Sequence, residues 1–200
     1  MKGKWVVPGI IAGVVLLLAM MFGGTYNSLV QDREKVTAAF SNVQTQYQRR
    51  ADLIPNLVNT VKGSSNFEQE TLTQVVEARS KATSIQVDPS KATPEEVAKY
   101  EEAQGQVGSA LGRLIAVAES YPDLKASAAY QDLMSQLEGT ENRIQVARSD
   151  YNEVARPYNA RVQTFPTNLI AGLFGFDKRA YFEAADGSDT APSVDFGTGN

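Results

Sequence analysis

The sequence contains no cysteine and no histidine. Without cysteine, disulfide bonds, thiolate metal sites and cysteine nucleophiles are excluded. Without histidine, the chain lacks the commonest general base, the commonest metal ligand and the usual serine-hydrolase triad. Paired carboxylates or a serine–lysine pair remain available, but no loop presents a convergent set of such groups. These absences predict a protein that is not an enzyme and carries no metal or other cofactor.

A strong charge of one sign is also missing. The 200 residues carry a formal net charge of −4, with acidic and basic residues interspersed. Such a pattern offers no electrostatic surface for nucleic acid, which is therefore not a predicted partner. Four glutamates between residues 95 and 102 could suggest cation binding. They lack the alternating oxygen ligands of a loop site, so they fit a solvated helix face better.

One long stretch near the N-terminus has no charge at all. Residues 5–22 form an uncharged run of eighteen, which as a helix spans about 27 Å, close to a bilayer core. We expect a membrane-spanning anchor over residues 1–25. A cleaved signal peptide is the alternative, with residues 23–25 as the cleavage region. Because Lys2 and Lys4 precede the span, the positive-inside rule places the domain outside the cytoplasm.

Two long stretches carry a seven-residue apolar repeat. In residues 26–62 and again in 127–165, nine of the eleven repeat positions are apolar or aromatic. Such repeats predict long helices that pack along one seam. The expected inward residues of the first are Tyr26, Leu29, Arg33, Val36, Phe40, Val43, Tyr47, Arg50, Ile54, Leu57 and Val61. Those of the second are Tyr130, Leu133, Leu137, Thr140, Ile144, Ala147, Tyr151, Val154, Tyr158, Arg161 and Phe165.

Two shorter helices are predicted between the long ones. Ser65 and Glu68 form a capping-box pattern that would start a helix ending near Ile85. Residues 93–96, Thr-Pro-Glu-Glu, would start another that ends before Tyr121. The inward face of this second helix is Val97, Tyr100, Gln104, Val107, Leu111, Leu114 and Ala118.

Short connections between these helices favour antiparallel neighbours. The sequence therefore predicts an all-α fold, in which an N-terminal transmembrane helix precedes an antiparallel bundle of about four long helices. The bundle should occupy residues 26–182 and run out, back, out and back. Residues 183–200 are small, acidic and proline-containing, which predicts a flexible tail.

Gly105, Gly108 and Gly112 lie inside the predicted third helix of the bundle. Each glycine costs roughly 1 kcal/mol relative to alanine in a helix, so a close approach by another helix should compensate. A tight crossing within the bundle and a contact between subunits both fit.

The stretch QRRADLIPNLVNTV at 48–61 combines charges and a proline with an unbroken apolar repeat. Pro55 removes one helical hydrogen bond and should kink the helix without ending it. The kink could shape the bundle or a partner groove. Pro157 holds a comparable interior position in the later long helix. Arg49, Arg50 and Asp52 are the charged candidates for an interaction site.

Aligning the two long helices with Tyr26 level with Phe165 puts Arg50 level with Glu141. We therefore expect the pair Arg49–Arg50 to be neutralised by Glu138 or Glu141. Opposite charges at the seam would fix the register of the two helices, and breaking a buried pair can cost about 3–5 kcal/mol.

Residues 166–176 follow the last long helix and are mostly apolar, but they are too few to span a bilayer. The predicted topology returns them to the membrane side. Contact with the lipid interface or a neighbouring subunit, with Leu173 and Phe174 as candidate residues, is one interpretation. A cap over the membrane-proximal end of the bundle is the other.

Several segments together resemble the LemA family of bacterial membrane proteins. They are YNSLV at 26–30, RRADLIPNLVNTVKG at 49–63, AESYPDLKAS at 118–127, ENRIQVARSDYNEVARPYN at 141–159 and Phe165-Pro166. The resemblance implies a single N-terminal anchor, an antiparallel helical bundle, no enzyme activity and no cofactor. It supplies no established binding residues.

Together these features predict a membrane-anchored, non-enzymatic scaffold in the bacterial inner membrane, with its domain outside the cytoplasm. It would act by homo-oligomerisation, which coiled-coil repeats also allow, or by binding partner membrane proteins through the bundle. The alternative function is that of a lipid-interface or membrane-remodelling protein that uses residues 166–176.

Overall fold

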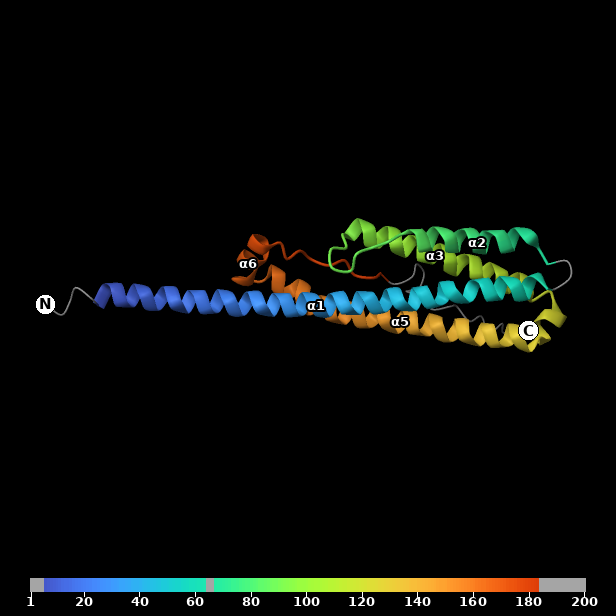
Figure 1. Ribbon diagram of the computed structural model, residues 1–200, viewed down its shortest axis with the longest axis horizontal. Helices are drawn as coiled ribbons and strands as arrows, with labels where there is room; N and C mark the ends of the chain where they lie inside the picture. The colour runs from blue at the N-terminus through green and yellow to red at the C-terminus, as the bar shows by residue number, and fades with distance from the viewer. Residues whose placement is uncertain (1–5, 64–66, 184–200) are drawn as a thin grey trace, which may run out of the picture.

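The computed structural model describes residues 6–63 and 67–183, most of which are helical and none of which forms a strand (Figure 1). The helices are α1 (Val6–Lys62), α2 (Gln69–Ser84), α3 (Pro94–Ala118), α4 (Pro122–Ala126), α5 (Ala128–Gln163) and α6 (Thr167–Phe174). The predicted all-α fold, with an apolar N-terminal helix ahead of helices that pack on one another, is confirmed. The predicted tail beyond residue 183 lies outside the described residues.

α1 is one uninterrupted helix of 57 residues that contains both the apolar N-terminal stretch and the first long repeat. Its N-terminal part projects beyond the other helices (Figure 1). Leu17 and Met20 are each 67% exposed there, so no other helix covers this stretch. By length and composition α1 could cross a membrane. The boundary placed between residues 25 and 26 falls inside this continuous helix.

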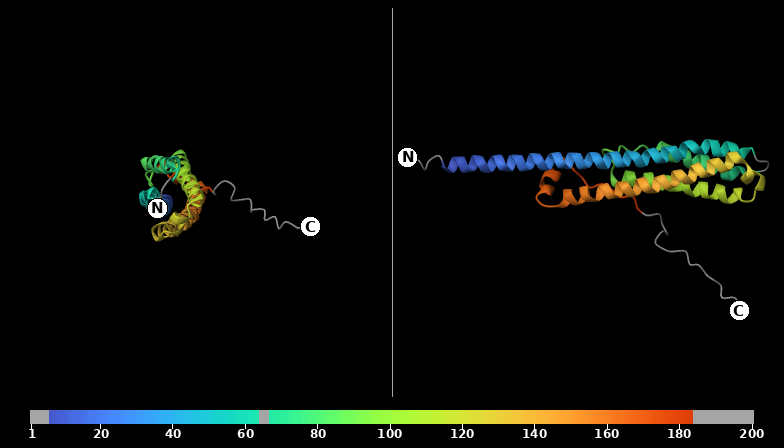
Figure 2. Two further views of the ribbon diagram at one scale, coloured as in Figure 1. Left: turned by 90° about the vertical axis from the view of Figure 1, so that its right-hand side faces the viewer. Right: turned by 90° about the horizontal axis from the view of Figure 1, so that it is seen from below.

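The long helices alternate in direction, as predicted. α1 runs away from the N-terminus, α2 returns, α3 runs out again and α5 returns alongside α1, as the views in Figure 1 and Figure 2 show. The most extensive contacts join α1 to α5 and α2 to α3, and α1 also packs on α2. The bundle therefore consists of two antiparallel pairs.

The predicted seam of α1 is buried from Leu29 to Val61, except that Arg33 is half-buried. The helix continues through Pro55, as expected. A proline has no N–H to donate to the carbonyl four residues earlier, which here belongs to Ala51. Arg79 of α2 donates its Nε–H to that carbonyl at 2.7 Å. The proline thus leaves an acceptor that ties α2 to α1.

The predicted inward residues of α5 are buried or half-buried from Tyr130 to Tyr158, but the prediction is wrong at the end of the helix. Arg161 and Phe165 are exposed, and Val162 is buried instead. An α-helix drifts by about 20° per heptad against a strict seven-residue repeat, so over so long a helix the inward position moves by one residue. Pro157 is exposed and does not interrupt α5.

The two predicted helix starts have different outcomes. At α3, Thr93 Oγ1 accepts from the Glu96 N–H at 3.2 Å, and the Glu96 carboxylate accepts from the Thr93 N–H at 2.9 Å, which is the predicted capping box. The predicted start of α2 is wrong, because that helix begins at Gln69 with Glu68 as its N-cap. Ser65 lies outside the described residues.

The glycines of α3 do not mark the close helix crossing that was expected. All three are exposed, and a Cβ at Gly105 or Gly112 would meet nothing within 4 Å. At Gly108 a Cβ would lie 3.9 Å from Arg50 Nη1, an ordinary contact. α3 packs with the face that carries Val107, which leaves the glycines facing outward.

The core consists of two clusters. The proximal cluster, nearer the apolar end of α1, is rich in aromatic residues: Leu29, Val36, Phe40, Val43, Tyr47, Val87, Val97, Tyr100, Ile144, Ala147, Tyr151, Ala155, Tyr158, Val162, Ile170, Ala171, Phe176 and Phe182. The distal cluster is mainly aliphatic: Ile54, Leu57, Val58, Val61, Leu72, Val75, Ala82, Ala103, Val107, Leu111, Leu114, Ala118, Leu124, Tyr130 and Leu137. Along α1, Arg50 separates the two.

Candidate interaction site at a buried arginine

Arg50 is a charged side chain at the junction of the two clusters, and only 3% of the residue is exposed. Its Nη1 donates to the Glu141 carboxylate of α5 at 2.9 Å. Its Nη2 donates to the main-chain oxygen and to Oε1 of Gln104 in α3, at 2.8 and 2.9 Å. Charge-assisted hydrogen bonds therefore join three helices at one guanidinium. The predicted pairing of Arg50 with Glu141 is present.

The other charged candidates lie outside this network. Arg49 and Glu138 are exposed, and neither forms an ion pair with another described residue. Asp52 is exposed and accepts a hydrogen bond from Gln48 at 2.7 Å. Neighbouring residues on a helix are about 100° apart, so only one arginine of the pair can face the seam. The expected neutralisation is confined to Arg50.

Sequence reasoning did not identify Gln104 as a partner of Arg50. The available signal was its polar side chain among apolar inward positions of α3. Gln104 is 8% exposed, so its side-chain oxygen needs a donor, and the buried guanidinium needs acceptors. A buried donor, Arg50, and a buried acceptor, Gln104, on facing helices could have been paired on this ground.

Two tyrosines pack beside the arginine. The Arg50 guanidinium carbon lies 5.2 Å from the ring centroid of Tyr47, and the Tyr47 ring meets Tyr100 edge-on at 5.5 Å. Burial raises the pKa of Tyr47 and raises the pKa of Tyr100 to about 12. Both phenols therefore stay protonated at neutral pH and add no charge to the junction.

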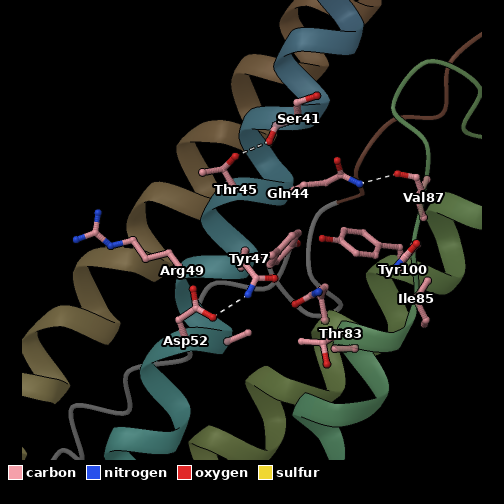
Figure 3. A pocket seen from close by; sticks show the side chains of 15 residues that line it. Ser41, Gln44, Thr45, Tyr47, Arg49, Asp52, Thr83, Ile85, Val87 and Tyr100 are labelled. Atoms are coloured by element: carbon pink, nitrogen blue, oxygen red, sulfur yellow. Dashed lines mark hydrogen bonds between the residues drawn. The ribbon is translucent and has the colours of Figure 1, made fainter.

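An open pocket of about 760 Å³, lined by both polar and apolar side chains, lies on one side of the junction, between α1 and the α2–α3 connection. Figure 3 shows Tyr47 and Tyr100 pointing toward one another within it, whereas Arg49 points away. Gln44 closes one side by donating to the Val87 carbonyl at 2.8 Å. Asp52 is the one carboxylate among the lining residues, so the pocket offers no pair of acids for catalysis.

A larger open depression of about 970 Å³ lies on the other side, between α3 and α5. We call it the α3–α5 groove, and its walls include Arg50, Gly105, Gly108, Ser109 and Glu141. Within residues 6–63 and 67–183, no group of three or more His, Cys, Asp or Glu side chains could hold a metal ion. Glu101, Glu102 and Glu183 also line the groove.

At its end nearer the apolar part of α1, the groove meets an extended segment, residues 177–183, which we call the strap. Asn152 of α5 donates to the Phe182 carbonyl at 2.7 Å and accepts from the Phe182 N–H at 2.9 Å. Asn159 exchanges the same two bonds with Arg179, both at 2.8 Å. Seven helical residues and three extended residues each span about 10 Å, so the two asparagines match the strap in register.

The strap was not predicted as a separate element. Its buried side chain, Phe182, stacks on Phe40 at 5.7 Å between ring centroids and meets Tyr151 at 5.1 Å. Arg148 holds its end by donating to the Glu183 carbonyl, and pairs with Glu101 of α3 at 2.9 Å. The available signal was the pair of asparagines seven residues apart on one face of α5.

The candidate residues of the last apolar segment lie on α6. Leu173 is 75% exposed and Phe174 is 54% exposed, whereas Ile170 and Ala171 are buried. The Phe174 ring meets Tyr26 of α1 edge-on, with centroids 4.9 Å apart. One face of α6 therefore caps the proximal cluster, and the other faces away from the protein.

Comparison with known proteins agrees with the resemblance found in the sequence. The model of the LemA family matches residues 39–196. The chain is similar to Protein LemA of Metamycoplasma hominis, with 31% identity over 83% of this chain and 72% of that protein. It is also similar to Magnetosome protein MamQ 2 of Paramagnetospirillum magneticum (30% identity) and Magnetosome protein MamQ of Magnetospirillum gryphiswaldense (28%), each over 82% of this chain and 67% of the relative.

Proposed function

Since this chain belongs to the LemA family, we propose that it is a membrane-anchored, non-enzymatic scaffold that acts by self-association or by binding partner proteins through its helical bundle. The observation that carries the proposal is the continuity of α1. One helix contains both the exposed apolar stretch and a buried seam of the bundle. A partner bound by the bundle is therefore held at a fixed height above the membrane.

The proposed location is the bacterial inner membrane, crossed once by the N-terminal part of α1. Lys2 and Lys4 stand before the apolar stretch, and Asp32, Arg33, Glu34 and Lys35 after it balance in charge. The positive-inside rule then favours an extracytoplasmic bundle.

The proposed binding surface is the α3–α5 groove. α3 and α5 belong to different antiparallel pairs and leave this groove open beside the junction and the proximal cluster. Gly105, Gly108 and Ser109 give its α3 wall a low profile, which suits the close approach of another polypeptide. Arg50 donates to Glu141 of α5 and to Gln104 of α3, and so links the two helices that border the groove.

The test is the mass of the detergent-solubilised chain over a range of concentrations. Gly105→Arg places a large side chain in the groove at a position where a Cβ meets nothing within 4 Å. Gly139→Arg is the matched control on α5, where a Cβ is equally free and the residue does not line the groove. Self-association through the groove predicts oligomers of the wild type and of Gly139→Arg that Gly105→Arg loses. A strict monomer throughout would remove the self-association form of the proposal.

A further inference from the structure

The membrane-proximal end of the molecule lacks charged side chains on two elements at once. α1 has none between Lys4 and Asp32, and the chain has none between Arg161 and Asp177. Asp32 and Arg161 form an ion pair with each other, so the last charges of α1 and α5 lie at the same height. α6 lies beyond that pair, beside the part of α1 that leads to the N-terminus (Figure 1).

The outward face of α6 is apolar and uncovered. Phe165, which precedes α6, is 75% exposed, and Leu169 and Leu173, four residues apart on α6, are 60% and 75% exposed. Residues with this spacing form one row on a helix surface. Phe174 extends the row toward α1, where it meets Tyr26. An uncharged row of large apolar side chains is costly to leave in water.

We propose that α6, together with Phe165, is a second membrane contact that lies along the boundary between lipid headgroups and acyl chains. The occupant of this face is the phospholipid bilayer, in the leaflet from which α1 emerges. The apolar face of α6 is continuous with that of α1, since Phe174 packs on Tyr26 only one helical turn after Phe22. The four residues from Phe22 to Tyr26 place the contact about 6 Å along α1 from the end of the apolar stretch. This distance is comparable to the depth of roughly 5–10 Å over which interfacial helices lie in the membrane boundary.

Aromatic side chains at this level suit the interface. Tyr26 presents its phenol beside Phe174 and Phe176, with ring centroids 4.9 and 5.6 Å away. Tyrosine is enriched at membrane–water boundaries because one end of its ring is apolar and the other polar. Met21 and Phe22 of α1 are 47% and 42% exposed, so the medium that covers them also reaches α6.

A second contact changes what the anchor does. A single helix lets the bundle rotate about the helix axis, whereas a second point of attachment beside it fixes that rotation. Through the strap, which follows α6 directly and is clasped by Asn152 and Asn159, this orientation passes to α5 and to the α3–α5 groove. The contact therefore sets which way the groove faces above the membrane.

The test uses tryptophan fluorescence of the full chain in phosphatidylcholine vesicles, with or without phosphatidylcholine brominated on its acyl chains. Trp5 is the single tryptophan of the chain, so Trp5→Phe provides a silent background. Leu173→Trp reports on α6 and Leu17→Trp on the apolar part of α1. Val146→Trp is the control, because Val146 is 60% exposed on α5, close in sequence to the Glu141 that pairs with Arg50.

We expect brominated lipid to quench the reporters at 17 and 173 and to leave the reporter at 146 unchanged. The inference rests on insertion of α1, which is part of the proposed function, and the reporters separate the two. Quenching at 17 without quenching at 173 would overturn the α6 contact and leave the anchor standing. That is also the result expected if a second copy of the chain, and not lipid, covers α6. No quenching at 17 would overturn both. Quenching at 146 as well would show the whole bundle lying on lipid and contradict a contact confined to α6.

Discussion

The distal cluster and the proximal cluster are assembled from different parts of the chain. The distal cluster joins helices that follow one another, chiefly the end of α1 with α2 and α3, through aliphatic side chains. The proximal cluster needs α6 and the strap from the other end of the sequence, and Phe182 covers Phe40 there. The distal half can thus form from local contacts, whereas the proximal half is complete only when the C-terminal segment is in place.

The clusters also differ in polarity. Aromatic side chains fill the proximal cluster, and its tyrosines carry hydroxyls that need partners. Tyr151, for example, donates to the Ala180 carbonyl of the strap at 2.8 Å. The distal cluster buries mainly Leu, Val, Ile and Ala, which make no such demand. Specific hydrogen bonds therefore define the half nearest the membrane, and apolar packing defines the other.

Replacing the residue between the two halves should have the largest effect. Arg50→Ala removes a buried side chain and leaves the buried Gln104 side-chain oxygen without its donor, which should together lower the free energy of unfolding by about 3–5 kcal/mol. Glu141, which is 48% exposed, can be hydrated once its partner is gone. Arg49→Ala, at the exposed neighbouring position, should change it by less than about 0.5 kcal/mol. Chemical denaturation of the detergent-solubilised chain measures both. Equal changes in the free energy of unfolding for Arg50→Ala and Arg49→Ala would contradict a stabilising role of Arg50 at the junction.

Phe182→Ala should separate the halves. It removes a buried ring from the proximal cluster and should cost roughly 3 kcal/mol. Hydrogen exchange should accelerate in α5 around Ile144 to Val162 and stay unchanged in α3 around Leu111. Tyr181→Ala, in the same strap but 43% exposed, is the control and should leave both regions protected. Loss of protection in both halves would show one cooperative core.

Alkaline pH should weaken the proximal half more than the distal half. Burial raises the pKa of Tyr100 and of Tyr151 to about 12, from 10 in the unfolded chain. Between pH 10 and 12 the unfolded chain loses these protons while the folded chain keeps them. The stabilisation is therefore complete below pH 10 and falls as pH rises, by about 2 kcal/mol per tyrosine at pH 12. Unfolding of Tyr100→Phe across this range should show a shallower decline, and an unchanged decline would contradict the assignment.

The smallest effect concerns the distal half. Arg79→Met removes the donor to the Ala51 carbonyl and should cost about 1 kcal/mol. Pro55→Ala restores a helical N–H for that carbonyl, so Arg79→Met should cost less in the Pro55→Ala background. A double-mutant cycle by thermal unfolding measures this coupling. Purely additive effects would show that Pro55 does not create the acceptor.

The features that could be predicted from sequence are periodic. The seam of α1 repeats every seven residues, and aligning it with the seam of α5 was enough to pair Arg50 with Glu141. The same method failed at Arg161, because the strict repeat ignores the drift of a straight helix.

The features that could not be predicted are aperiodic. The strap has no repeat, and side chains of α5 hold it by hydrogen bonds to the main chain of the strap. The glycines of α3 were misread because a helix that tolerates glycine need not be crossed closely. Gly105 faces open space instead. Composition identifies a low-profile wall but not what approaches it.

The scaffold proposal is tested most directly by crosslinking in native membranes from a photoreactive residue at position 105, in the α3–α5 groove, against the same residue at position 139. A scaffold that acts through this groove should give a covalent product from position 105 that contains peptides of a second copy of this chain or of another membrane protein, and none from position 139. No product from position 105, or the same products from both positions, would contradict a scaffold that acts through this groove.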